Sequence, residues 1–335
     1  MTFEEKLKNG EYEQIWREYC GFLDLSMDEY MAIQNRLLKE QMDLWCASPL
    51  GQKILKGRRP RTIEEFRQMV PLTTYDDYAD VLLQKKEEML PEKPIIWIQT
   101  TWEGGKHPIK TAPYTRGMLQ TYKTNVLACM ILSTSNEKGK FDIEPGDAFL
   151  YALAPLPYTT GLIPLGLKDE IDVEFLPPVS EAVNMTFSER NKRGFKLGMK
   201  KGIDFFFGLG SVAYYVSLSV AAMSEGGKGG SKLKKMMSMS PSMVLRYLKA
   251  KQLCKKENRE LKPKDLFTLK GFVCAGTDNR CYKDDLEDLW GVRPIEVFSG
   301  TEPSCIGIET WSRNGLYFFP DTCFYEFMPE EEMRK

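Results

Sequence analysis

A threonine and a glutamate end a strand-like apolar run at Val297-Phe298-Ser299-Gly300-Thr301-Glu302. The Thr301 hydroxyl is suited to phosphate oxygens, and the Glu302 carboxylate is a hard oxygen ligand of the kind that Mg2+ prefers. Much earlier in the chain, a second polar loop runs from Gly104 to Lys110, with two glycines that let the backbone approach an anion and with two lysines. Two such loops predict a single nucleotide site that both of them line.

Several further segments occur with these loops in one order along the chain. They are Ile95 to Thr100, Pro113-Tyr114-Thr115, Gly146-Asp147 through Pro157, Gly271 to Gly276, Trp290 to Glu302, and Thr322 to Pro329. Together they resemble the adenylate-forming superfamily, and within it the auxin-responsive-promoter family of acyl-acid amido synthetases. In that family these segments are the phosphate loop with its strand and helix, the substrate loop, the adenine-binding region and a later strand.

The resemblance implies a role for each matched residue. Phe298 would stack on adenine, Thr301 would touch the α-phosphate, and Glu302 would bind Mg2+; Lys106, Thr301 and Glu302 form the expected catalytic set. The remaining nucleotide-binding residues would be Thr100, Thr101, Gly104, Gly105, Gly276, Thr277, Asp278, Ser299 and Gly300. Tyr151, Tyr158 and Phe207 would line the acid pocket, although aromatic residues at strand ends are usually core.

Simpler interpretations stay open for both loops. The Gly/Lys loop is not a Walker A sequence, because His107 follows Lys106 where Ser or Thr is required, and it can be an ordinary surface turn. Trp102 and Glu103 stand where the superfamily has small polar residues, and a carboxylate repels a triphosphate. The Thr-Glu segment can be a capping turn with a solvated Glu302. His107 is the only histidine, which excludes a multi-histidine zinc site.

Composition narrows the class of partner. The 335 residues contain 46 Lys and Arg against 47 Asp and Glu, so no net charge recruits nucleic acid or a membrane, and a small molecule is the expected ligand. The eight cysteines form no Cys-x-x-Cys pair, and the acidic start of the chain is unlike a secretory signal; both favour the cytoplasm. The uncharged stretch Phe205 to Met223 mimics a membrane span, but Gly208-Leu209-Gly210-Ser211 interrupts it.

The predicted elements form an α/β protein with mainly parallel sheets flanked by helices. Residues 1–90 are expected to be a helical N-terminal region, with helices over Thr2 to Cys20, Met27 to Trp45, Ile63 to Met69 and Tyr75 to Glu87. Residues 91–335 are expected to be the adenylation-type core. Its strands are predicted at Ile95 to Ile98, Ala148 to Ala154, Val173 to Leu176, Ile203 to Phe207, Leu269 to Cys274 and Pro294 to Phe298. Closing strands are predicted at Cys305 to Glu309, Leu316 to Phe319 and Thr322 to Phe327.

Between these strands the sequence predicts helices over Arg116 to Leu132, Asn184 to Lys200, Val212 to Met223 (with Ser211 as N-cap), and Cys281 to Trp290. A basic helical insertion is predicted from Lys232 to Lys256. Its cations could attract an anionic partner such as the phosphates of CoA or a carrier protein, and a solvated helix face is the simpler interpretation. Ligands of open α/β sheets bind beyond the carboxyl ends of the strands, where both polar loops are expected.

The resemblance also implies an activity. ATP and Mg2+ would convert a small carboxylic acid into an acyl-adenylate, for transfer to an amine or thiol acceptor such as an amino acid or CoA. The superfamily's ribose-binding aspartate segment and its C-terminal lid domain are not found before Lys335, so the chain is expected to be a fragment or a truncated relative. The alternative is a non-catalytic relative that binds a nucleotide or an acid.

Overall fold

A seven-stranded sheet forms the centre of the computed structural model, which describes the chain except residues 102–103, 152, 225–238, 277–278 and 334–335. In sheet order the strands are Val173–Leu176 (β4), Asp147–Tyr151 (β3), Phe205–Leu209 (β5), Gly271–Ala275 (β6), Ile295–Gly300 (β7), Ser304–Glu309 (β8) and Leu316–Phe318 (β9). The first five strands are parallel, and β7, β8 and β9 pair antiparallel. The predicted α/β class with a mainly parallel sheet is confirmed.

Successive side chains of each central strand enter two separate cores. On β3 and β5, Phe149, Tyr151 and Phe207 pack in one cluster, whereas Leu150 and Phe206 pack in the other. Since side chains alternate between the faces of a sheet, a strand covered on both faces must be apolar throughout. This explains why these strands appear in the sequence as continuous apolar runs.

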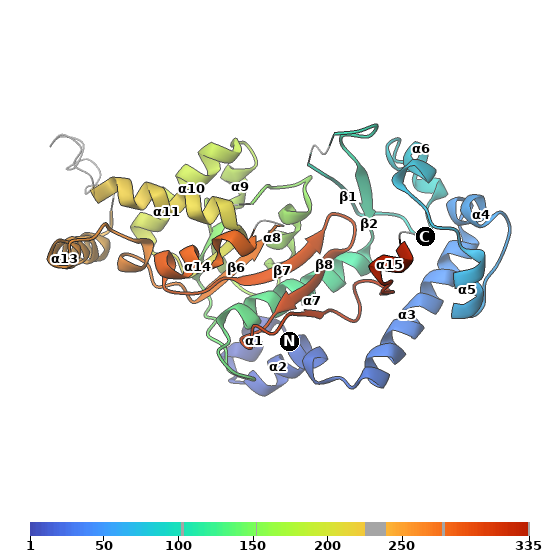
Figure 1. Ribbon diagram of the computed structural model, residues 1–335, viewed down its shortest axis with the longest axis horizontal. Helices are drawn as coiled ribbons and strands as arrows, with labels where there is room; N and C mark the ends of the chain where they lie inside the picture. Colours follow the sequence, from blue (N-terminus) through green and yellow to red (C-terminus); the bar gives the residue numbers. More distant parts are fainter. Residues whose placement is uncertain (102–103, 152, 225–238, 277–278, 334–335) are drawn as a thin grey trace.

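Helices cover both faces of the sheet (Figure 1). Residues from helices Phe3–Lys8 (α1), Tyr12–Cys20 (α2), Arg116–Thr134 (α7) and Leu162–Leu167 (α8) complete the first core. Residues from Phe187–Lys201 (α10), Gly210–Ser224 (α11), Pro241–Glu257 (α13) and Asn279–Trp290 (α14) complete the second. The helices predicted from Arg116, Asn184, Val212 and Cys281 are therefore present, α10 preceded by the short Val179–Ala182 (α9). The basic helix predicted from Lys232 to Lys256 begins at Pro241 in the described residues, and the part of the prediction before Met239 lies outside them.

The start of α11 differs from the prediction. The helix begins at Gly210, so Ser211 lies within its first turn and is not the N-cap. The Gly210 amide instead donates to the Oδ1 atom of Asn279, a buried residue of α14, at 3.0 Å. A cap supplied from another helix replaces the local one. Among the described residues, no helix is long and apolar enough to cross a membrane.

The first predicted strand does not join the parallel sheet, which corrects the prediction. Ile96–Gln99 (β1) pairs antiparallel with Thr111–Tyr114 (β2) in a separate two-stranded sheet, with Trp97 opposite Pro113. Pro113 has no amide hydrogen to donate, so a proline within a sequence segment argues against predicting a strand there. A two-stranded sheet has only edge strands, and an edge strand tolerates a proline. The polar loop at residues 100–110 is therefore the turn of a β-hairpin.

The N-terminal helices are more broken than predicted. The expected helix from Thr2 to Cys20 divides into α1 and α2 near Gly10, whose φ of +75° is left-handed. Met27–Ala47 (α3), Pro49–Leu55 (α4) and Ile63–Met69 (α5) follow, and α3 leads away from the sheet to one end of the molecule (Figure 1). The expected helix over Tyr75 to Glu87 is instead a 3-10 turn at Tyr75–Asp77, a four-residue helix Ala79–Leu82 (α6) and a second 3-10 turn at Glu87–Met89.

The predicted closing strand from Thr322 to Phe327 is wrong. This segment is irregular, and the short helix Glu330–Met333 (α15) follows it. Side chains satisfy its backbone in place of a strand ladder. The buried Gln34 of α3 donates to the carbonyls of Pro320 and Cys323, both at 2.6 Å, and accepts from the Tyr325 amide at 2.9 Å. Gln34 therefore ties the end of the described chain to its N-terminal helices.

Replacing Gln34 tests this connection. Gln34→Ala should lower the free energy of unfolding in urea by about 2 kcal/mol, because three hydrogen bonds are lost and two carbonyls lose a donor. Gln41→Ala, the same change at an exposed position of the same helix, should lower it by less than about 0.5 kcal/mol. Equal effects of the two changes would contradict this role for Gln34.

Candidate functional site

Three loops that are far apart in sequence meet beside the carboxyl ends of the parallel strands. They are the hairpin loop at 100–110, the segment Pro155 to Thr159 after β3, and the turn Thr301 to Pro303 between β7 and β8. The Gln99 amide, at the end of β1, donates to the Pro157 carbonyl at 2.8 Å, and Gln99 forms an isolated parallel bridge with Tyr158. The hairpin and the segment after β3 are thus joined through their backbones.

The Thr301 carbonyl joins the turn between β7 and β8 to the base of the β1–β2 hairpin and to the segment after β3. It accepts from the Tyr114 hydroxyl at 3.0 Å and from the Thr159 hydroxyl at 3.3 Å. Tyr114 is fully buried, and burial raises the pKa of its phenol, so the hydroxyl keeps its proton and remains a donor. The sequence analysis assigned no role to the Tyr114 and Thr159 side chains. The motifs that contain these residues do not show that both side chains reach the turn at Thr301, which is more than 140 residues away in the chain.

The Thr-Glu turn presents its polar atoms to solvent. The pairing of β7 with β8 shifts register between Phe298 and Ser299, and this irregularity precedes the turn. The Phe298 side chain is 50% exposed although its neighbours in β7, Val297 and Ile295, are buried. Glu302 is exposed as well. Burial, and second to it the negative charge of Glu302, raises the pKa of Tyr78.

Gly276, which is predicted to lie beside the adenine, is next to Phe298 at the edge of the sheet. Ala275 of β6 pairs with Val297 of β7 in parallel register, so Gly276 and Phe298 come next to each other at the sheet edge. Gly276 has a φ of +119°, a conformation that favours glycine, and it places no side chain against a ligand. Thr277 and Asp278 lie outside the described residues. The sheet register therefore brings together the two described parts of the predicted adenine site.

The Gly/Lys loop is held by an acid that sequence reasoning did not identify. Asp76 accepts from Lys106 Nζ at 3.2 Å and contacts His107 Nε2 at 2.7 Å, and all three side chains belong to the surface near the hairpin. The Lys106 ammonium, and to a smaller extent His107, holds the pKa of Asp76 below its usual value. A bound triphosphate would have to draw Lys106 away from this ion pair.

The other predicted residues of this loop differ in how available they are. Thr100 is buried, and its hydroxyl accepts from the Lys110 amide at 3.0 Å, so it stabilises the hairpin. Thr101 is exposed, and Gly104 and Gly105 have φ values of +78° and +74°. Trp102 and Glu103 lie outside the described residues. Thr101 and the two glycines are thus the parts of the loop that can approach an anion.

The predicted acid-pocket residues fall into two groups. Tyr158 is half-buried at the junction with the hairpin. Tyr151 and Phe207 are buried in the first core, and the Tyr151 hydroxyl donates to the Thr160 carbonyl at 3.0 Å. Tyr151 thus supports the loop that carries Tyr158, while its participation in an acid pocket remains a prediction.

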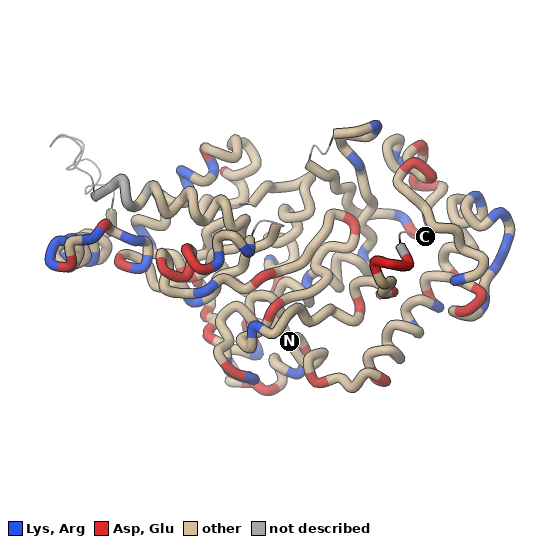
Figure 2. Tube along the Cα trace, viewed as in Figure 1, with Lys and Arg blue, Asp and Glu red and all other residues tan. Residues whose placement is uncertain are grey.

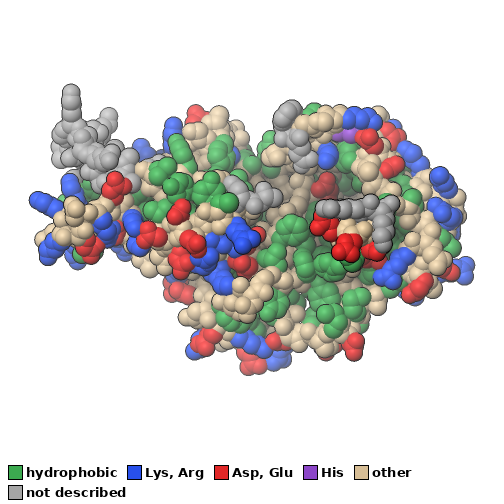
Figure 3. All heavy atoms as spheres, in the orientation of Figure 1, with side chains coloured by type: hydrophobic (Ala, Val, Ile, Leu, Met, Phe, Trp, Pro, Cys, Tyr) green, Lys and Arg blue, Asp and Glu red, His purple; other side chains and the backbone are tan. Residues whose placement is uncertain are grey.

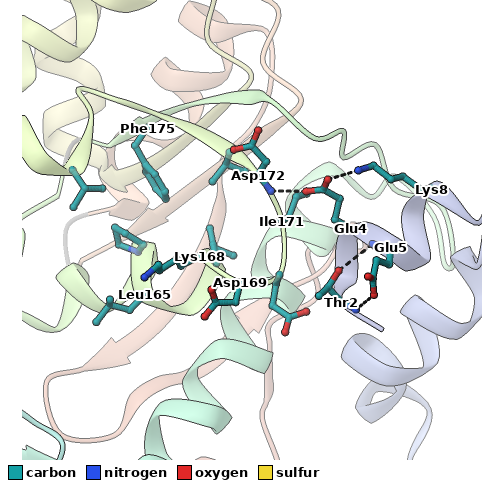
Figure 4. A pocket seen from close by; sticks show the side chains of 15 residues that line it. Thr2, Glu4, Glu5, Lys8, Leu165, Lys168, Asp169, Ile171, Asp172 and Phe175 are labelled. Carbon is teal, nitrogen blue, oxygen red and sulfur yellow. Dashed lines mark hydrogen bonds and ion pairs between the residues drawn. The ribbon is translucent and has the colours of Figure 1, made fainter.

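A large open cavity of about 690 Å3 lies elsewhere in the molecule, beside the beginning of β4 (Figure 4). Residues of α1 and of the connection from α8 to β4 line it, and many of its charged groups are already satisfied: Glu4 accepts from Lys8 Nζ and from the Asp172 amide. The cavity contains none of the predicted site residues. The three connected loops, and not this cavity, are the candidate functional site.

The described site residues fit a nucleotide and a magnesium ion. Phe298 offers a half-exposed ring, Gly276 and the loop glycines offer backbone without side chains, and Glu302 offers an exposed carboxylate. No group of three or more His, Cys, Asp or Glu side chains that could hold a metal occurs among the described residues. A single carboxylate suits Mg2+, which usually keeps several waters and binds phosphates as further ligands.

Comparisons with known proteins found one family match and several similar folds. Residues 20–154 match the GH3 family N-terminal domain, and no curated protein matches the chain. The fold is similar to that of the acyl acid amido synthetase AtGH3.15 in complex with 2,4-DB, with a TM-score of 0.56, 11% identity, and coverage of 90% of this chain and 58% of that one. It is also similar to 2-hydroxyisobutyryl-CoA ligase in complex with 2-HIB-AMP and CoA, with a TM-score of 0.53, 15% identity, and coverage of 90% and 60%.

The chain therefore spans less than two thirds of the length of these structures. The family match includes the β1–β2 hairpin and reaches the end of β3, and the fold similarity extends over nine tenths of the chain. Residues 20–154 are thus similar to a GH3 family N-terminal domain, and the fold of the chain agrees with the fold that the resemblance to the adenylate-forming superfamily implies.

Proposed function

We propose that the protein is the core of an ATP-dependent ligase that forms an acyl-adenylate from a small carboxylic acid. The observation that carries the proposal is that the base of the β1–β2 hairpin, the segment after β3 and the turn between β7 and β8 meet at the Thr301 carbonyl, to which Tyr114 and Thr159 donate. Parallel α/β sheets bind ligands at this edge. One of the similar solved structures is a complex with 2,4-DB and another a complex with 2-HIB-AMP and CoA, and this supports an acid and ATP as substrates.

In the proposed reaction, a carboxylate oxygen of the acid attacks the α-phosphorus of ATP, and the bond to the leaving pyrophosphate breaks. Phe298 would hold the adenine, and the Thr301 hydroxyl would orient the α-phosphate. Lys106, once released from Asp76, would balance charge on the phosphates, and Glu302 would hold Mg2+, which neutralises charge on the leaving group. An amine or thiol acceptor would then take the acyl group from AMP, and the identity of that acceptor is open.

The experiment that tests the proposal is exchange of labelled pyrophosphate into ATP. It should be run with aromatic and short aliphatic acids, on this chain and on the longest natural reading frame that contains it. Acid-dependent exchange is the expected result. Absence of exchange with every acid, together with undetectable ATP binding, would sink the ligase proposal.

One observation favours a second candidate, a relative that binds an acid without catalysis. Lys106 is paired with Asp76, so the loop's cation is already neutralised. Calorimetry distinguishes the two candidates, because a binding protein should hold the acid equally well with or without ATP and Mg2+. Cooperative binding of acid and ATP would reject this second candidate.

Glu302→Gln tests the metal role. The change preserves shape but removes the charge, so affinity for ATP in the presence of Mg2+ should fall about tenfold or more, while affinity for AMP without metal should not change. Isothermal titration calorimetry measures both. Glu88→Gln, at an exposed position in a 3-10 turn, is the matched control and should behave like the parent. An equal loss of ATP and AMP affinity would contradict the metal role.

Phe298→Ala tests the adenine contact. Loss of one stacking platform is worth about 1–3 kcal/mol, so affinities for ATP and AMP should fall together by about tenfold to a hundredfold. Phe187→Ala is the control, because Phe187 is 48% exposed, close to the 50% of Phe298. If Phe298→Ala binds both nucleotides like the parent, the nucleotide site is not at this sheet edge.

Tyr114→Phe tests the connection between the loops. The Thr301 carbonyl loses its shortest hydrogen bond, so unfolding free energy should fall by about 1 kcal/mol and ATP affinity by a few-fold. Tyr325→Phe removes comparable bonds to the Ile306 and Phe319 carbonyls and should reduce stability without reducing ATP affinity. Urea unfolding and calorimetry separate the two effects. Equal ATP affinities of the two variants would show that the Tyr114 contact is only structural.

A further inference from the structure

Helix α13 lies at one end of the molecule, opposite the end reached by α3 to α6 (Figure 1). Ser240 caps its first turn and Pro241 occupies the first helical position. It is anchored through one face, on which Met243, Tyr247, Ala250 and Cys254 are buried in the second core. The spacing of these four residues corresponds to a single stripe of a helix, so the opposite face points away from the protein.

The outward face combines leucines with lysines. Leu245 is 61% exposed, and Leu248 and Leu253 are 46% and 45% exposed. The exposed lysines of this helix lie among these leucines and are Lys249, Lys251, Lys255 and Lys256, whereas Arg246 donates to the Leu266 carbonyl at 2.8 Å. In the part of the chain that the structure describes, none of the four lysines makes an ion pair, and the nearest acid, Glu257, is paired with Arg259 at 2.5 Å.

The charge of this region is unlike that of the whole chain. Residues 226–256 contain no Asp or Glu, whereas the chain as a whole has a net charge of −1. Their cations are nine in number: Lys228, Lys232, Lys234, Lys235, Arg246, Lys249, Lys251, Lys255 and Lys256. The first four lie outside the described residues. Figure 2 shows Lys and Arg positions along α13 at this end of the molecule, and Figure 3 shows basic side chains there. Residues 226–256 are therefore strongly basic although the total charge of the chain is nearly balanced.

We propose that the outward face of α13 binds the surface of an anionic phospholipid membrane. Lysines provide attraction to acidic headgroups, and the exposed leucines enter the boundary between headgroups and acyl chains, which is how basic amphipathic helices associate with membranes. Two contributions are needed, because neither a few leucines nor a few lysines alone gives stable attachment. A helix at the extremity of the molecule can lie on a flat surface.

An acidic protein is the other anionic partner that the charge would fit. The leucines distinguish the two partners, because they are interspersed with the lysines along an outward helix face and do not gather in a separate apolar pocket. This inference does not rest on the proposed ligase activity. No residue of the candidate site belongs to α13, so membrane binding and catalysis can be tested separately.

Vesicle co-sedimentation with the full chain tests the proposal. One set of vesicles is pure phosphatidylcholine, and the other contains about one third phosphatidylserine. Preferential binding to the anionic vesicles, weakened by salt, is expected. The charge variant Lys249→Gln, Lys251→Gln, Lys255→Gln and Lys256→Gln should weaken binding at least tenfold, since each cation near an anionic surface contributes about fivefold. Leu245→Ser with Leu248→Ser should weaken it at least threefold, because two apolar side chains are lost from the boundary.

Matched controls separate a specific surface from general charge. Lys39→Gln, Lys56→Gln, Arg59→Gln and Arg61→Gln remove the same number of exposed charges from the α3–α5 end and should bind vesicles like the parent. Leu72→Ser is the control for the leucine variant, because Leu72 is fully exposed. Circular dichroism confirms that each variant is folded. The proposal is overturned by equal binding to both vesicle types, or by equal losses in the control and α13 charge variants.

A binding assay with soluble polyglutamate tests the alternative that the partner of α13 is an acidic protein. If polyglutamate binds as strongly as the anionic vesicles and the leucine variant binds both like the parent, the face belongs to an acidic protein and the membrane proposal is wrong. If the leucine variant loses vesicle binding but keeps polyglutamate binding, the membrane proposal is supported.

Discussion

The hydrogen bond from the Tyr114 hydroxyl to the Thr301 carbonyl organises the candidate site. Tyr114 is the last residue of β2, so its hydrogen bond fixes the position of the β1–β2 hairpin. Thr301 is the first residue of the turn between β7 and β8. Thr159 donates to the same carbonyl from the segment after β3. A single backbone oxygen thus fixes the base of the hairpin, the segment after β3 and its own turn relative to one another. Because Tyr114 is fully buried, a lost partner there would leave a polar group without solvent, and this favours one arrangement.

The parallel sheet supplies the second constraint. Because β5, β6 and β7 run in one direction, their carboxyl ends reach the same edge, and the register places Gly276 beside Phe298. The two cores hold that edge rigidly, since each strand buries alternate side chains on both faces. An aromatic ring can then remain half exposed at the edge without loosening the sheet. Rigid strands with exposed loop residues are the usual arrangement of a ligand site.

The Lys106 side chain of the Gly/Lys loop can pair with Asp76 when no ligand is bound and with a phosphate when a nucleotide is bound. Asp76 accepts a hydrogen bond from Lys106 and contacts His107, and the lysine lowers the pKa of the Asp76 carboxyl group, which favours its ionised form. These groups are largely exposed, so the ion pair is weak and easily exchanged. A polyanion that approaches the loop would compete with a single carboxylate for Lys106. The ion pair can therefore keep the loop ordered without preventing phosphate binding.

The sequence by itself determined the element types wherever local pattern and burial agree. Largely apolar runs predicted β3, β5 and β6, since central strands covered on both faces bury most of their side chains, and the motif order predicted the adenylate-forming fold. The sequence did not predict β2, because Pro113 argues against a strand, and it wrongly predicted a strand at Thr322 to Phe327. There the apolar side chains suit a strand, but Gln34, far away in sequence, satisfies the backbone instead. The sequence also predicted four site residues, Phe298, Thr301, Glu302 and Lys106. Only the tertiary structure revealed the residues whose hydrogen bonds position these site residues, which are Tyr114, Thr159 and Asp76. The physical reason is that a motif records residues adjacent in the chain, whereas a hydrogen bond between Tyr114 and Thr301 depends on how the whole chain folds.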